Sequence, residues 1–145
     1  SVMAPSVRFL SERGVPVCAH LGLLPQSVNL TGYRAQARDG VGAERLLLEA
    51  AELEAAGAQL LVLESIPAML AEEVTQRLAV PTIGIGAGLH CNGQVLVLHD
   101  LLGLTEQPPR FAKNFLSGGA DIEQAVRHYV EAVKSGGFPG PEHCF

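Results

Sequence analysis

The 145-residue sequence lacks several features that would assign it to a class at once. No apolar run approaches the roughly 20 residues that a membrane-spanning helix needs, so we expect no membrane segment. The first residues carry neither the basic region nor the long apolar stretch of a secretory signal. They also lack an initiator Met, and we therefore expect a piece of a longer chain.

Charged residues are few, and Lys and Arg are fewer than Asp and Glu. Charged side chains make up 17% of the residues, and the formal net charge is −5. Lys and Arg are nowhere clustered, which argues against nucleic acid as the main partner. The three cysteines, Cys18, Cys91 and Cys144, are odd in number and widely spaced, as is typical of reduced thiols in a cytoplasmic protein. An apolar content of 48% then indicates one folded domain over residues 1–145.

The sequence does contain an alternation of short apolar segments with amphipathic ones. We expect strands over residues 15–19, 60–64, 81–85 and 94–98, and helices over 1–13, 42–56, 67–79 and 122–134. This alternation predicts an α/β protein with a parallel sheet. Four strands are too few to close an eight-stranded barrel, so the sheet is either small and open or half of something larger. Beyond them, residues 101–145 are expected to hold an irregular stretch, the last helix and a Gly/Pro-rich tail.

Apolar spacing assigns a buried face to each predicted helix. Asp121 is a plausible N-cap of the last helix, with Gln124 as its capping-box partner. The expected buried residues are Met3, Val7 and Leu10; then Leu46, Leu47, Ala50, Leu53 and Ala56; then Met69, Leu70, Val74 and Leu78; and finally Ala125, Val126, Tyr129, Val130 and Val133.

The stretch Q-L-L-V-L-E-S-I-P at residues 59–67 carries the strongest functional signal. Its apolar run shows no polar alternation, which is typical of a strand buried on both faces. The run stops at Glu64, where a parallel strand of an α/β fold presents its chemistry. Glu64 is therefore our first candidate for a general base or acid. The alternative is a strand-end carboxylate that pairs with a nearby cation.

His20 and Asp100 also follow predicted strands, and we expect both at the same edge of the sheet as Glu64. A histidine there can donate to a substrate carboxylate or hold one tautomer for proton transfer. The alternative is a structural histidine with its hydrogen bonds satisfied.

The glycine run Gly84–Gly88 allows backbone N–H groups to approach a ligand, so it is either a phosphate cradle or a tight turn. It is not the dinucleotide fingerprint, because Leu89 stands where the third glycine belongs. The adjacent pairs His90-Cys91 and His143-Cys144 lack the spacing of a zinc site, and we expect no metal there.

Five blocks occur in order along the chain: H-L-G-L-L-P-Q-S-V-N from His20, L-V-L-E-S-I-P from Leu61, I-G-I-G-A-G from Ile83, G-Q-V-L-V-L-H-D from Gly93 and F-A-K-N-F from Phe111. With the ending Y-V-E-A-V-K-S-G-G-F-P-G-P-E-H-C-F, they resemble the C-terminal half of the ketopantoate hydroxymethyltransferase (3-methyl-2-oxobutanoate hydroxymethyltransferase) family. The resemblance covers nearly all of the chain.

The resemblance implies the second half of a (β/α)8 TIM barrel in a cytoplasmic homo-oligomer. It implies transfer of a hydroxymethyl group from 5,10-methylenetetrahydrofolate to 3-methyl-2-oxobutanoate, giving 2-dehydropantoate for pantothenate biosynthesis. Glu64 then matches the family's catalytic base, and His20 matches a residue beside the keto acid. The family's Mg²⁺ ligands lie on its first four strands, so none is expected in this chain.

The chain departs from the family pattern at three places. Leu24 replaces a usual threonine, Asn92 replaces a usual acidic residue, and the motif around Thr31-Gly32-Tyr33 is shortened. Two other functions stay open beside the enzyme. One is an inert or degenerate relative that serves as an assembly partner, and the other is a barrel enzyme that binds a phosphorylated substrate at Gly84–Gly88.

Overall fold

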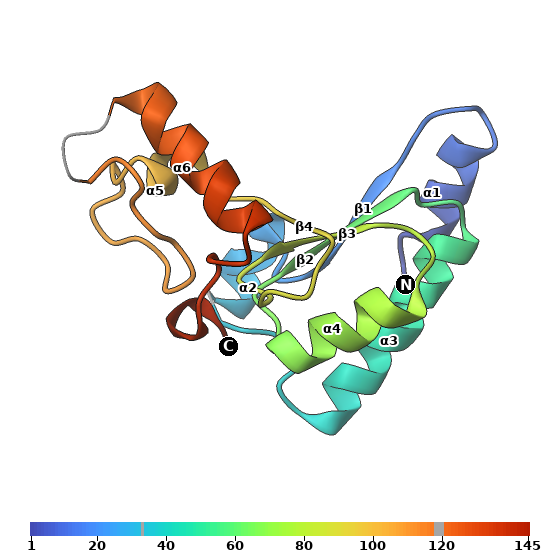
Figure 1. Ribbon diagram of the computed structural model, residues 1–145. Coiled ribbons are helices and arrows are strands. Elements are labelled where there is room, and N and C mark those ends of the chain that lie inside the picture. Colours follow the sequence, from blue (N-terminus) through green and yellow to red (C-terminus); the bar gives the residue numbers. More distant parts are fainter. Residues whose placement is uncertain (33, 118–120) are drawn as a thin grey trace.

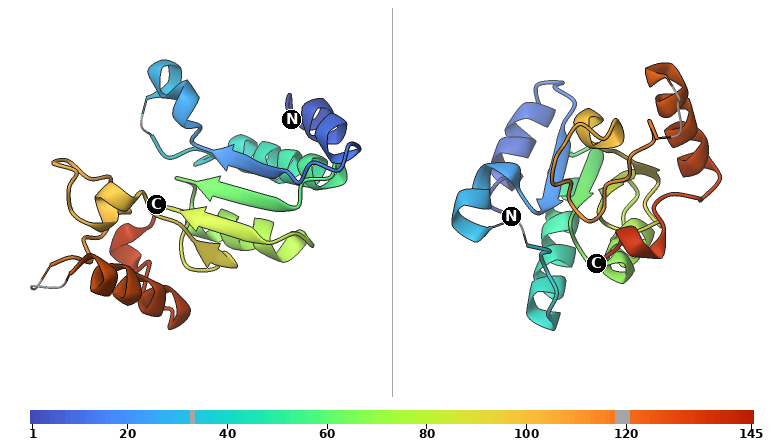
Figure 2. Two further views of the ribbon diagram at one scale, coloured as in Figure 1. Left: turned by 90° about the horizontal axis from the view of Figure 1, so that it is seen from above. Right: turned by 90° about the vertical axis from the view of Figure 1, so that its left-hand side faces the viewer.

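A computed structural model of the protein describes residues 1–32, 34–117 and 121–145 (Figure 1). Its strands are β1 (Cys18–Gly22), β2 (Leu60–Glu64), β3 (Thr82–Ile85) and β4 (Gly93–Gln94). They form one sheet in the order β1-β2-β3-β4, and every pair is parallel (Figure 2). The sheet stays open between β1 and β4, so the predicted α/β half of a barrel is confirmed.

The helices lie before, between and after the strands. Three of them, α1, α3 and α4, pack their apolar residues against one face of the sheet. The bounds are α1 (Ala4–Ser11), α2 (Val28–Thr31), α3 (Gly40–Ala55), α4 (Ala68–Arg77), α5 (Leu98–Leu101) and α6 (Ile122–Lys134), with 3₁₀ turns at Pro25–Ser27 and Pro141–His143. No helix of the described ranges is long and apolar enough to cross a membrane.

Strand β2 alternates in burial along its length. Leu61 and Leu63 are 1% and 0% exposed against the helices, whereas Leu60, Val62 and Glu64 are only half-buried. The prediction of a strand buried on both faces is therefore wrong. The physical reason is that the helices of the main core cover only one face of the open sheet.

Strand β1 starts three residues later than predicted. Its residues pair in register with β2, from Cys18 opposite Leu60 to Gly22 opposite Glu64. Pro16 has no N–H for a ladder, and before Cys18 the Val17 carbonyl oxygen accepts the Gln59 N–H at 2.9 Å. His20 consequently lies in the middle of β1, and its predicted place at the strand end is wrong.

The last strand is much shorter than predicted. β4 has a single neighbour in the sheet, and after it the Val95 N–H still donates to the Gly84 carbonyl oxygen at 3.0 Å. The chain then turns, because the N–H groups of Asp100 and Leu101 both donate to the Val97 carbonyl oxygen. Asp100 therefore lies in the short helix α5 and not at a strand end.

Helix α3 buries the predicted stripe, with Leu46, Ala50 and Leu53 at 5% exposure or less. In α4 the prediction fails at Met69, which is 76% exposed while the next residue, Leu70, is buried. In α1 only Val7 of the three expected residues is buried, since Met3 and Leu10 are exposed.

Helix α6 has its predicted capping box. The Gln124 N–H donates to Asp121 Oδ1 at 2.8 Å, and the Asp121 N–H donates to Gln124 Oε1 at 3.3 Å. Its predicted face is only partly buried, because Val126 and Val130 remain 38% and 40% exposed. The helix packs on a small second core rather than on the sheet; the core is formed by Leu101, Leu102, Phe115, Ala125 and Phe138.

Candidate functional site

Glu64 is the last residue of β2, and its backbone is fixed from both sides. The Leu23 N–H donates to the Glu64 carbonyl oxygen at 2.9 Å, and the Ser65 N–H donates to the Ile85 carbonyl oxygen at 2.9 Å. Ser65 itself adopts a φ of +51°, which is unusual for a residue other than glycine. Such strain persists only where the surroundings impose it, and it often marks a functional site.

Gly22 allows β1 to end directly against Glu64. It has a φ of +94°, and a Cβ atom there would lie 2.1 Å from the Glu64 carbonyl oxygen. Any side chain at this position would therefore push the two strand ends apart. The glycine in H-L-G-L is thus a requirement of the site's backbone.

The structure brings His20 and Glu64 together on the face of the sheet opposite α3 and α4. His20 Nε2 lies 3.1 Å from Glu64 Oε2, and the two side chains are 32% and 14% exposed. The contact is close but not aligned as a hydrogen bond, and Nε2 is buried without a hydrogen-bond partner among the described residues. The hydrogen-bonding capacity of Nε2 is therefore unused among the described residues.

Glu64 lines a cavity of about 690 Å³ at the C-terminal ends of the strands. Asp100 reaches the same cavity from α5, where it is 7% exposed and accepts a hydrogen bond from Thr105 Oγ1. His20 contacts Glu64 but does not itself line the cavity. The complete lining is Leu23, Pro25, Val28, Arg34, Ala35, Glu64, Ser65, Ile85, Val97, Asp100, Thr105, Gln107, Pro109, Arg110, Phe111 and Phe145.

Several cavity residues were not found by sequence reasoning, among them Arg34, Arg110 and Phe145. They come from irregular segments, which carry no periodicity that could place a side chain on a face. The available signal was their place in or beside the quoted blocks, since Phe111 opens F-A-K-N-F and Phe145 closes the ending. Tyr33, in the shortened motif after β1, lies outside the described residues.

The glycine run forms a packed turn. A Cβ atom at Gly86 would lie 2.6 Å from the Phe111 ring, and one at Gly88 would lie 2.4 Å from Ala68 Cβ. Both residues have positive φ angles, of +61° and +80°. The close approach that glycine permits is thus made to the protein's own atoms, which favours the tight turn over the phosphate cradle.

Neither adjacent His-Cys pair gathers further ligands. Within the residues that the structure describes, no group of three His, Cys, Asp or Glu side chains could hold a metal ion. His143 is buried, accepts the Gly140 N–H on Nδ1 at 3.0 Å and packs edge-on against Phe138. We interpret His143 as a structural residue of the tail.

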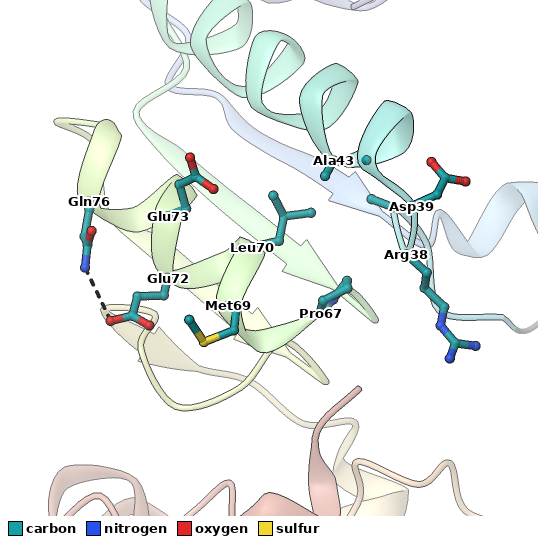
Figure 3. A pocket seen from close by; sticks show the side chains of 11 residues that line it. Arg38, Asp39, Ala43, Pro67, Met69, Leu70, Glu72, Glu73 and Gln76 are labelled. Carbon is teal, nitrogen blue, oxygen red and sulfur yellow. Dashed lines mark hydrogen bonds between the residues drawn. The ribbon is translucent and has the colours of Figure 1, made fainter.

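A second cavity, of about 570 Å³, lies between the start of α3 and α4 (Figure 3). Its wall includes Asp39, Met69, Glu72 and Gln76, and it belongs to the helical layer, away from Glu64. None of the candidate catalytic residues lines it. The chemistry therefore belongs to the cavity at the strand ends.

Comparison with known proteins gives a consistent result. The family model described as ketopantoate hydroxymethyltransferase matches residues 1–141. The 3-methyl-2-oxobutanoate hydroxymethyltransferase of Thiobacillus denitrificans is 59% identical over the whole chain and 56% of its own length. The same-named proteins of Nitrosospira multiformis and Halorhodospira halophila are 57% and 55% identical over 100% and 98% of the chain, and 56% and 52% of their own lengths. The chain spans about half the length of the curated relatives it matches.

Proposed function

The chain belongs to the ketopantoate hydroxymethyltransferase family, and on that premise we propose that it takes part in hydroxymethyl transfer to 3-methyl-2-oxobutanoate. The donor is 5,10-methylenetetrahydrofolate, and the product is 2-dehydropantoate. The observation that carries the proposal is the carboxylate of Glu64. It is 14% exposed, lines the cavity at the strand ends and lies 3.1 Å from His20.

Glu64 acts as the general base. Its carboxylate takes the proton from C3 of the keto acid, and the electron pair of that C–H bond forms the enolate. C3 then forms a bond to the methylene carbon of the folate while the bond from that carbon to N10 breaks, and a water oxygen replaces N5 on the same carbon. The proton taken by Glu64 and one proton of the water end on N10 and N5 of the leaving tetrahydrofolate. Backbone hydrogen bonds fix the main chain on both sides of Glu64, so its carboxylate needs little reorganisation for proton transfer.

His20 orients the keto acid beside this base. Its Nε2 is buried and lacks an aligned partner among the described residues, although Glu64 lies 3.1 Å away. The contact of 3.1 Å leaves no room for an atom between the two side chains, so His20 would turn away from Glu64 for a substrate oxygen to satisfy this nitrogen. Binding of the substrate would thereby place C3 close to Glu64 Oε2.

Magnesium does not fit this chain by itself. The cavity offers two carboxylates, Glu64 and Asp100, and Asp100 is already engaged by Thr105. No group of three His, Cys, Asp or Glu side chains that could hold a metal ion occurs among the described residues. If the reaction uses Mg²⁺, its ligands come from the part of the family's sequence that this chain does not cover.

We therefore propose that the chain works together with the N-terminal half-barrel of the family, in a cytoplasmic homo-oligomer. The open sheet presents two free edges, at β1 and at β4, for such a partner. The closed barrel would cover the face of the sheet that carries His20 and Glu64.

The test is hydrogen–deuterium exchange at C3 of 3-methyl-2-oxobutanoate in D₂O, which requires no folate. The chain is co-expressed with the N-terminal half of the Thiobacillus denitrificans relative, and the assembly should exchange the proton. Glu64→Gln keeps the shape of the side chain and should lower the exchange rate by roughly 10²–10⁴, the usual contribution of a positioned base.

Glu72→Gln is the matched control, since Glu72 lies on α4 in the other cavity. It should leave exchange unchanged. Exchange by an assembly with Glu64→Gln at the original rate would remove Glu64 as the base. An assembled protein that shows no exchange at all would support the inert alternative.

A further inference from the structure

The C-terminal segment Phe138–Phe145 brings Phe145 to the cavity at the strand ends. The Phe145 ring lines the cavity and packs edge-on against Phe111, with the ring centroids 6.4 Å apart. The Phe145 carbonyl oxygen accepts the Ala68 N–H at the start of α4, at 3.3 Å. The segment is therefore attached both to the sheet's helical layer and to the loop that holds Phe111.

Arg110 is held against this segment and also lines the cavity. Its Nε donates to the Glu142 carbonyl oxygen at 3.1 Å, and its guanidinium carbon lies 5.9 Å from the centre of the Phe145 ring. These contacts use Nε and one face of the guanidinium group. The two terminal nitrogens have no hydrogen-bond partner among the described residues, so they remain available to a ligand.

Arg110 forms no ion pair with a carboxylate among the described residues. Arg45, Arg77 and Arg127 each form an ion pair with a glutamate four residues away on their own helix. Arg110 and the other cavity arginine, Arg34, form no such pair within the described residues. An arginine that is positioned by neutral groups and left without a counter-ion is suited to bind an anion from outside.

The cavity holds more than a small keto acid. Its volume of about 690 Å³ lies in the range of sites that take drug-sized molecules. The lining holds two carboxylates, Glu64 and Asp100, which repel an anion, and two guanidinium groups, Arg110 and Arg34, which attract one. Its apolar side chains, Phe111 and Phe145 among them, suit the aromatic part of a ligand.

We propose that Arg110 binds the acidic tail of the second substrate, which in the proposed function is the glutamate carboxylate of the folate. This inference rests on the proposed function and adds a specificity residue to it. A guanidinium group with both terminal nitrogens free can donate two parallel hydrogen bonds to a carboxylate. The segment around Glu142 and Phe145 then acts as a positioning element, because it fixes the orientation of Arg110.

The test is calorimetric titration of the 145-residue chain with two probes. The first is 5-formyltetrahydrofolate, which has the glutamate tail, and the second is 6-methyltetrahydropterin, which lacks it. Arg110→Gln should weaken binding of the first probe by roughly 10- to 100-fold, the usual contribution of a charge-assisted hydrogen bond. Binding of the tail-less probe should change less than about twofold, on the same reasoning.

Two further variants sharpen the result. Arg110→Lys keeps the charge but loses the bidentate geometry, so its affinity for the first probe should be intermediate. Arg127→Gln removes an arginine of α6 that pairs with Glu123 outside the cavity, and should change neither affinity. Far-UV circular dichroism of each variant shows whether the fold is retained.

The proposal is overturned if Arg110→Gln binds the folate as well as the unchanged chain does, if both probes lose affinity equally, or if the unchanged chain binds no folate. The C3 exchange assay uses no folate and so tests the proposed function separately. Normal exchange with unchanged folate affinity in Arg110→Gln would refute this inference alone. Loss of folate affinity without any exchange activity would refute the proposed function alone.

Discussion

The two faces of the sheet differ sharply, although the same short strands supply both. Towards the helices, Ala19, Leu61 and Leu63 are at most 7% exposed and form the centre of the main core. On the opposite face, His20 and Glu64 are half-buried and stand next to a large cavity. Alternate residues of one strand thus serve stability and chemistry separately, so the two properties can be perturbed one at a time.

The largest stability effect is expected on the helix-covered face. Leu63→Ala removes a fully buried side chain, and the cavity that remains should destabilise the fold by about 2–5 kcal/mol. Met69→Ala is the control, because Met69 is 76% exposed and should change stability by less than about 0.5 kcal/mol. Urea unfolding followed by circular dichroism measures both. Equal losses in the two variants would contradict the contrast between the faces.

A smaller loss of stability is expected at Gly22, where β1 ends against Glu64. Gly22→Ala should destabilise the fold by about 1–3 kcal/mol, because the new Cβ overlaps the Glu64 carbonyl oxygen and the φ of +94° disfavours a side chain. Gly14 also has a positive φ, but a Cβ atom there would meet open space. Gly14→Ala therefore measures the cost of the backbone conformation without a steric overlap. If both variants lose the same stability by urea unfolding, the close approach to Glu64 contributes nothing.

Thiol reactivity should also distinguish the faces. Cys18 is exposed on the open face, whereas burial raises the pKa of the Cys91 thiol. A raised pKa leaves less thiolate at a given pH, so Cys91 should react with a maleimide more slowly than Cys18 near pH 7. The difference between the two reaction rates should narrow as the pH rises towards the pKa of Cys91, because the thiolate fraction of Cys91 then increases. Peptide mapping by mass spectrometry reads each rate, and equal rates at pH 7 would disprove the difference.

The smallest stability effect is expected for the candidate base. Glu64→Gln keeps the shape of a half-buried side chain on the open face, and should change the free energy of unfolding by less than about 0.5 kcal/mol. Urea unfolding at pH 7 measures it. A loss above about 1 kcal/mol would mean that the contact with His20 is mainly structural.

Features fixed by local interactions were predictable from the sequence. The apolar stripe of α3, the end of β2 at Glu64 and the capping box at Asp121 all depend on residues close in the chain. Each of these elements therefore follows from spacing, propensity or capping chemistry alone.

Features fixed by distant contacts were not predictable. The shift of β1 depends on its pairing with β2, and the exposure of Met69 depends on where the chain places α4. The position of Arg110 depends on a segment more than thirty residues further along, through the Glu142 carbonyl oxygen. Ser65 has an ordinary sequence context, and its positive φ arises only from the bonds that hold the end of β2.

The open sheet has a consequence for how any activity depends on concentration. β1 and β4 each have one neighbour, and an edge strand offers its free backbone groups to whichever strand is present. If a separate half-barrel completes the site, the amount of completed site follows mass action and scales with the product of the two concentrations. Dilution would then lower the specific activity, and a covalent linker between the halves would remove this dependence because the association becomes intramolecular. Copies of the chain that pair with one another through the same edges would compete with the productive partner.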